Sequence, residues 1–189
     1  VPGYETILAH CGELAARYVQ AESTCYDLGC SLGATSLAMR SRINANNAKI
    51  VSVDNSQAML SKLSKILESI PSRIQTELVN QDVCECNIDN ASMVVLNFTL
   101  QFVPKNKRRA LIEKIYNGLN PGGCLVISEK LHFEPESLNW LLSDLHHQFK
   151  RSQGYSDLEI SQKRDSLENV LIPETLDTHI QRLNSCGFK

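Results

Sequence analysis

Residues 27–35 read DLGCSLGAT, and their types and spacing fit two different kinds of chemistry. Gly29, Ser31 and Gly33 match the G-x-S-x-G elbow, which presents a nucleophilic serine in α/β hydrolases. The same residues fit a glycine-rich loop whose backbone approaches a bound nucleotide. In the first case the Ser31 hydroxyl attacks a substrate. In the second case its small side chain leaves room for a cofactor.

The hydrolase elbow needs an acid and then a histidine later in the chain. The histidines after the loop are His132, His146, His147 and His179. None of them lies in a suitable loop after Glu129, the acid at the end of the last predicted strand, and no HGGG-like oxyanion segment precedes the loop. We therefore interpret the stretch as a cofactor loop in which Ser31 is not a nucleophile.

Helices and strands are expected to alternate around this loop. Apolar periodicity predicts helices at 4–19, 34–43, 56–69 and 105–119, and strands at 24–28, 49–53, 75–80, 92–97 and 124–129. The turn residues 120–123, Asn-Pro-Gly-Gly, end the fourth helix. Strands that are apolar along most of their length and alternate with helices predict a doubly wound, mostly parallel α/β sheet.

The pattern changes after Glu129 to helices predicted at 136–150, 157–169 and 173–184. The length of 189 residues and the 42% hydrophobic content fit one domain, 1–189, with a helical segment at about 130–175 inside it. We expect this segment to serve substrate binding or dimerisation. We also expect the chain to lack the last strands of the fold.

Polar side chains stand where the predicted strands end, which is where parallel sheets bind ligands. Asp54 and Asn55 follow the second strand, Asp82 follows the third, and Asn97 ends the fourth. An acid about 20 residues after a glycine loop, such as Asp54, is typical of ribose binding, because one carboxylate accepts from two neighbouring hydroxyls. The sequence therefore predicts a nucleoside site at this edge.

Composition excludes several other classes of function. The net charge of -2 and the pI near 6.2 give no overall electrostatic reason to bind nucleic acid. The seven cysteines include no C-x-x-C pair and accompany no signal peptide, which indicates reduced thiols in a cytoplasmic protein without a metal site. No apolar run approaches the roughly 20 residues that span a bilayer.

The glycine loop with its preceding acid resembles motif I of class I S-adenosylmethionine (SAM) methyltransferases, D/E-x-G-x-G-x-G. Here Asp27 is the acid, and Ser31 replaces the central glycine. The resemblance implies a Rossmann-like class I methyltransferase fold with a helical insertion or cap. It also places Asp54, Asp82 and Asn97 near the ribose, the adenine and the methionine end of SAM.

Longer stretches resemble one family, the carboxy-SAM synthases of the wobble-uridine tRNA modification pathway. The matching runs are VPGY, YDLGCSLGAT, DNS with AM two residues later, NASMVVLNFTLQF, GLNPGG, GYSDLEISQKR and LENV. Together they cover most of the chain. The family pattern ELEISQKR appears as residues 157–164, DLEISQKR, with one conservative difference.

This resemblance implies an enzyme that converts SAM and prephenate into carboxy-SAM and phenylpyruvate. A separate enzyme uses the product to make 5-oxyacetyl uridine in tRNA, so direct tRNA binding is not expected. The resemblance also implies a homodimer and a site without metal. The implied contacts to the SAM-derived ligand are Tyr4, Gly29, Cys30, Ser31, Asp54, Asn55, Asp82, Val83, Asn97 and Arg164.

Arg164 is the residue that separates this function from ordinary methyl transfer. An arginine on a polar helix is usually a solvated charge. Carboxy-SAM, however, differs from SAM by one carboxylate, which a guanidinium binds with two parallel hydrogen bonds. We therefore expect Arg164 to recognise that carboxylate, in its own or a partner's site. His146 and His147 are interpreted as helix-surface residues.

Two other functions fit parts of the sequence. An ordinary SAM-dependent methyltransferase acting on a small molecule or RNA accounts for everything except the Arg164 region. A SAM-binding module without catalysis also accounts for the glycine loop and the polar strand ends.

Overall fold

The computed structural model describes residues 2–167 and 170–189, without the side chains of residues 163–167. Its five strands form one parallel sheet in the order β3-β2-β1-β4-β5. The strands are β1 Thr24–Leu28, β2 Lys49–Asp54, β3 Gln75–Asn80, β4 Ala91–Asn97 and β5 Leu119–Ser128. The predicted parallel α/β sheet is confirmed.

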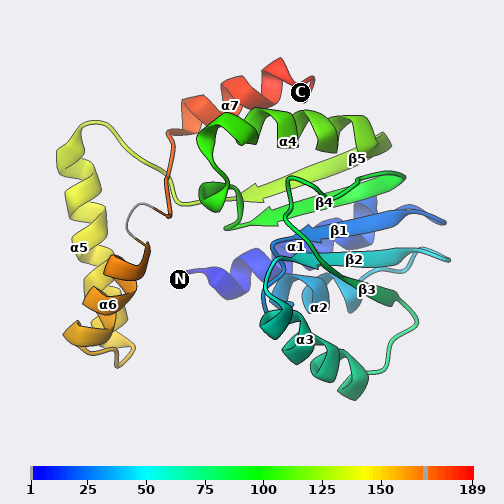
Figure 1. Ribbon diagram of the computed structural model, residues 1–189, viewed down its shortest axis with the longest axis horizontal. Helices are drawn as coiled ribbons and strands as arrows, with labels where there is room; N and C mark the ends of the chain where they lie inside the picture. Colours follow the sequence, from blue (N-terminus) through cyan, green and yellow to red (C-terminus); the bar gives the residue numbers. More distant parts are fainter. Residues whose placement is uncertain (1, 168–169) are drawn as a thin grey trace.

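Helices cover both faces of the sheet (Figure 1). They are α1 Tyr4–Tyr18, α2 Ala34–Arg40 and α3 Gln57–Ser69, then α4 Lys105–Gly118 and α7 Leu176–Ser185. Neighbouring strand residues alternate between two cores: Cys25 packs with α1 and α2, whereas Tyr26 packs with α4. All five residues of β1 are buried, including the polar Thr24 and Asp27.

The predicted turn at 120–123 lies inside β5 rather than before it. Leu119 already pairs with Ala91, and regular pairing resumes between Cys124 and Met93, so residues 120–123 form a bulge. Gly122 has a φ of 78°, which glycine adopts without strain. The strand therefore begins five residues earlier than predicted because the chain returns to β4 on both sides of the turn.

Two helix boundaries also differ from the prediction. Helix α2 ends at Arg40 rather than at residue 43. Helix α7 begins at Leu176 rather than at residue 173, because the Thr175 side chain caps it by accepting from the Thr178 N–H at 3.2 Å.

The segment after β5 forms a helical hairpin, α5 Glu136–Ser152 and α6 Asp157–Leu167, at one side of the sheet (Figure 1). The described part of α5 contains no buried residue. The two chain segments that connect the hairpin to the sheet run side by side, with a bridge between Leu131 and Glu174 and a hydrogen bond from the His132 N–H to the Glu174 carbonyl at 3.0 Å. None of the described helices is both long and apolar enough to cross a bilayer.

A buried arginine anchors the segment that returns from the hairpin. The Arg108 side chain is 0% exposed and donates to the carbonyls of Val103, Gln101 and Ile172 at 2.8, 3.1 and 2.8 Å. It also forms an ion pair of 2.6 Å with Glu174, which Arg182 of α7 contacts as well. This network joins α4, α7 and the returning segment.

A carboxylate stabilises the turn after β4. Glu129 accepts from the N–H groups of Thr99, Leu100 and Gln101 at 3.1, 2.7 and 3.1 Å, at the start of the short 3-10 helix η1 Leu100–Phe102. Burial raises the pKa of Glu129 to about 7, although these three donors act in the opposite direction. Glu129 thus fixes the backbone directly after Asn97.

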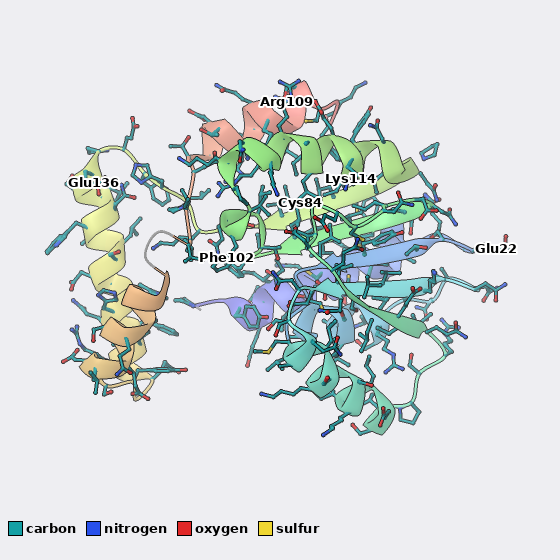
Figure 2. The ribbon with its side chains drawn as sticks, in the orientation of Figure 1. Glu22, Cys84, Phe102, Arg109, Lys114 and Glu136 are labelled. Atoms are coloured by element: carbon teal, nitrogen blue, oxygen red, sulfur yellow. The ribbon has the colours of Figure 1, made fainter. Side chains whose placement is uncertain are left out.

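We expect Arg108→Met to lower the free energy of unfolding by about 3–5 kcal/mol, because it leaves buried acceptors and the Glu174 carboxylate without their partner. Urea unfolding followed by circular dichroism measures the change. Arg109→Met is the matched control: Arg109 (Figure 2) neighbours Arg108 in sequence but is exposed and forms an ion pair with Glu113. Equal stability of the two variants would contradict the role given to Arg108.

Glu129 makes stability depend on pH. Its pKa is higher in the folded than in the unfolded chain, so the folded state binds the proton more tightly. The free energy of unfolding should therefore fall as the pH rises from about 4.5 to about 7, by up to about 3 kcal/mol. Glu129→Gln should remove this part of the slope, whereas the exposed control Glu113→Gln should keep it. Parallel stability curves for wild type and Glu129→Gln would contradict the prediction.

Candidate functional site

The glycine loop leaves β1 through a run of left-handed backbone. Gly29, Ser31 and Gly33 have φ values of 81°, 50° and 81°. A Cβ at Gly29 would overlap the Thr99 side chain, and one at Gly33 would overlap Leu63, so both positions need glycine for space as well as for φ. The loop therefore folds tightly against its neighbours before α2 begins.

Ser31 has the environment of a loop residue rather than of a nucleophile. Its side chain is exposed, and no described side chain hydrogen-bonds to its hydroxyl. Its backbone N–H donates to Asp54 Oδ2 at 2.8 Å. These contacts favour the cofactor-loop interpretation over the hydrolase elbow, which requires a base beside the serine.

Asp54 connects two turns at the end of β2. Besides the Ser31 N–H, its carboxylate accepts the Ser56 N–H on Oδ1 at 2.8 Å, where α3 begins. Each oxygen keeps a second lone pair for a ligand hydroxyl. Asp54 therefore supports the loop and the helix start, and it also lines a cavity at the ends of the strands.

A cavity of about 1570 Å³ lies at the carboxyl ends of the strands. Predicted site residues in its wall are Tyr4, Gly29, Ser31, Asp54, Asn55, Asp82, Val83 and Asn97. Cys30 is buried behind the loop beside Leu60 and Leu63, and it does not line the cavity. Arg164 belongs to α6, but its side chain lies outside the described residues. Eight of the ten predicted residues are therefore brought together.

Asn97 presents an unused acceptor. Its Nδ2 donates to Thr35 Oγ1 at 2.9 Å, whereas its buried Oδ1 has no hydrogen-bond partner among the described residues. Buried polar atoms rarely stay unpaired, so this oxygen is suited to a donor on a ligand. Tyr4 lies close by, with its ring centroid 6.3 Å from that of Phe98. An amide acceptor thus stands beside two aromatic rings.

Asp82 is partly used by its own turn. Its Oδ1 accepts the Cys84 N–H at 2.8 Å, which is the ordinary turn contact of a residue at a strand end. Lys114 of α4 stabilises this loop, because its ammonium group donates to the carbonyls of Cys84 and Cys86 (Figure 2). This support holds the Asp82–Val83 backbone at the rim of the cavity.

The acid of the loop motif lies under the site instead of in its wall. Asp27 is 1% exposed and accepts a hydrogen bond from Ser36, which also contacts Ser52 at 2.7 Å. Burial raises the pKa of Asp27 to about 6. Its position suggests support for the loop rather than direct contact with a ligand.

Sequence reasoning missed one side of the cavity. The histidines His146 and His147, interpreted from sequence as helix-surface residues, are partly buried on α5 and line the cavity. The cavity face of α5 comprises Asn139, Leu142, Ser143, His146, His147 and Lys150. These positions recur at helical spacing, so a polar face on a helix next to the site was the available signal. Lys130 and His132, between β5 and α5, line the cavity as well.

Comparison with solved structures shows the same fold at low sequence identity. A methyltransferase-like protein from Bacillus halodurans has a TM-score of 0.71 at 16% identity, with 97% of this chain and 69% of the other covered. A cyclopropane synthase from Mycobacterium tuberculosis has a TM-score of 0.67 at 14% identity, with 94% and 59% covered.

Sequence comparison gives a closer relation. Residues 25–123 match the methyltransferase domain family. The carboxy-S-adenosyl-L-methionine synthase of Trichlorobacter lovleyi is 54% identical over 189 residues, and that of Aliivibrio salmonicida is 51% identical over 189 residues. Each alignment covers 100% of this chain and 78% of the relative. Identity of this extent, on a class I methyltransferase fold, shows that the chain belongs to the carboxy-S-adenosyl-L-methionine synthase family.

Proposed function

We propose that this protein converts SAM and prephenate into carboxy-SAM and phenylpyruvate. The observation that carries the proposal is the cavity, in which eight predicted ligand residues meet in a volume of about 1570 Å³. Sites for one small ligand usually measure about 300–1,000 Å³, so this cavity has room for SAM and a second molecule. The family relation supports the same reaction.

SAM fits the sheet side of the cavity in one orientation. The ribose hydroxyls donate to the free lone pairs of Asp54. The adenine amino group donates to Asp82, and the Val83 N–H donates to a ring nitrogen. The amino group of the methionine end donates to the unpaired Oδ1 of Asn97. This orientation puts the methionine end of SAM near Tyr4 and Phe98.

The proposed reaction needs no nucleophile from the protein, because the two substrates supply all the reacting groups. Prephenate loses its ring carboxylate as CO2 and its ring hydroxyl as hydroxide, which leaves phenylpyruvate. Hydroxide removes a proton from the SAM methyl group, which the sulfonium acidifies, and gives water and a sulfonium ylide. The ylide carbon then bonds to CO2. The protein orients both substrates and excludes bulk water, so that the ylide is not protonated before it meets CO2.

Arg164 supplies the contact that ordinary methyl transfer does not need. We assign its guanidinium to the new carboxylate of carboxy-SAM, because planar bidentate pairing is the strongest contact available to that group. Position 164 lies one helical turn after Ile160, which lines the cavity. A separate cytoplasmic enzyme then uses the product to modify the tRNA wobble uridine to 5-oxyacetyl uridine, and this chain does not itself bind tRNA.

The proposal includes a homodimer formed through α5. The face of α5 away from the cavity carries Trp140, Leu141 and Leu145, which are 71%, 47% and 50% exposed. Large apolar side chains exposed on a helix are typical of an interface. A partner subunit would cover these side chains.

We expect Asp54→Asn to weaken SAM binding by roughly 10- to 100-fold, because one ribose hydroxyl would face an amide N–H in place of an acceptor. Isothermal titration calorimetry measures the Kd. Asp89→Asn is the control: it makes the same carboxylate-to-amide change at a residue that accepts from the Tyr26 hydroxyl, and Asp89 does not line the cavity. Unchanged affinity in a folded Asp54→Asn protein would contradict the ribose assignment.

The proposed reaction is tested by mass spectrometry of the small molecule released when protein purified from a bacterial host is denatured. Wild type should release SAM plus the mass of one CO2. Arg164→Ala should release SAM or its demethylated product, whereas Arg151→Ala, which changes only an exposed ion pair of the same hairpin, should behave as wild type. Release of plain SAM by wild type would favour an ordinary methyltransferase. Normal carboxy-SAM formation by Arg164→Ala would refute the role of Arg164.

A further inference from the structure

The side of the cavity opposite the predicted SAM residues is rich in cationic and titratable groups. Lys130 follows β5, and His146, His147 and Lys150 lie on the cavity face of α5. The two segments are separate in sequence and join in one wall. None of the residues inferred to hold SAM belongs to this group.

The four acids that line the cavity, Asp54, Asp82, Glu129 and Glu159, each accept hydrogen bonds from nearby backbone N–H groups. Glu129 accepts three backbone N–H groups, and Asp54 accepts two. Glu159 is held by the N–H and the hydroxyl of Ser156, at 2.8 and 2.7 Å. Among the described side chains, Lys130 and Lys150 form no ion pair. Within the described part of the chain, the ammonium groups of Lys130 and Lys150 are therefore available to a ligand anion.

The cations are close enough to affect one another. Burial lowers the pKa of His146, and the charge of Lys150 lowers it further, as do those of Lys130 and His147. An effect of Lys130 on His146 places the end of β5 and the face of α5 within electrostatic range. Like charges held together destabilise the empty site, and a bound anion would relieve that repulsion.

We propose that Lys130, His146 and Lys150 form the subsite that binds the carboxylates of the second substrate. This inference rests on the proposed function, because it assumes that SAM occupies the sheet side of the same cavity. The ligand is an organic dianion. Cations on two elements provide separate partners for two carboxylates, whereas a neutral methyl acceptor would not compensate the charge of this wall.

The charge of this subsite also suits the reaction, because it favours binding of the two substrates on opposite sides of the cavity. SAM is a cation at its sulfonium, so a cluster of cationic side chains does not attract it and leaves that side free for the anion. The anion then lies between the sulfonium and the wall. Opposite charges on the two substrates favour their contact in the interior, where electrostatic interactions are weakly screened.

The test compares Lys130→Met, His146→Gln, Lys150→Met and the Lys130→Met/Lys150→Met double variant with wild type. Lys62→Met on the exposed side of α3 is the control for loss of a lysine charge. The KM for prephenate is measured at saturating SAM by carboxy-SAM formation, and the Kd for SAM is measured separately by calorimetry. Thermal melting establishes that each variant is folded.

We expect each single lysine variant to raise the KM for prephenate by roughly tenfold or more, because one charged hydrogen bond is lost. The double variant should raise it further. The Kd for SAM should stay within about twofold of wild type. Added salt should raise the wild-type KM more than that of the double variant, since screening weakens only the charges that remain.

Two results would overturn the subsite. One is a KM for prephenate in the variants equal to that of the Lys62→Met control. The other is an equal loss of SAM and prephenate binding in folded variants, which would place the cations at the SAM side or in the support of the whole cavity.

A second measurement separates the subsite from the proposed reaction. Prephenate is titrated calorimetrically into protein saturated with S-adenosylhomocysteine, so that no turnover occurs. If wild type binds prephenate and the double variant binds it at least tenfold more weakly, the subsite stands even if no carboxy-SAM is formed and the reaction fails. If wild type does not bind prephenate, the subsite is refuted.

Discussion

The Asp54 carboxylate holds together the two turns on which the cavity depends. One oxygen fixes Ser31 in its left-handed conformation, and the other fixes the start of α3 at Ser56. Both N–H groups are ends of turns that no strand satisfies, so without this carboxylate they would lose their partners. The shape of the loop and the direction of α3 are therefore set by the same side chain that is proposed to bind ribose. A substitution of Asp54 would therefore affect both the local fold and the proposed ligand contact.

In a parallel sheet, residues from several strands can serve one site, because the carboxyl ends of all the strands meet at one edge. Asp54, Asp82 and Asn97 come from three strands and reach one cavity. The hairpin contributes differently: α5 presents polar side chains to the cavity and apolar side chains to the outside, the reverse of a helix packed on a sheet. Its position depends on polar anchors such as Arg108 rather than on a hydrophobic core.

The sheet was predictable from sequence to within a few residues because β1, β2 and β4 are buried along nearly all of their length. Strands β1 and β3 begin and end where the apolar pattern does. The eight cavity residues followed from strand ends and family motifs. The bulge at 120–123 could not be predicted, since the pairing of Leu119 before the turn depends on contacts with β4 and not on turn chemistry. The sequence did not reveal that His146 and His147 line the cavity, because a polar face on a helix normally indicates solvent, and only the tertiary position of α5 turns it toward the cavity.

The paired segments at Leu131 and Glu174 connect the helical hairpin to the rest of the protein. The hairpin leaves the sheet and returns to it through this one crossing, with Arg108 holding the return at Ile172. The two walls of the cavity thus lie on parts of the chain that meet at these paired segments, which can act as a pivot. A ligand that touches both walls fixes the angle of the pivot when it binds. Its affinity therefore includes the stiffness of this joint, and a substitution in the arginine anchor, which does not line the cavity, would alter recognition at a distance.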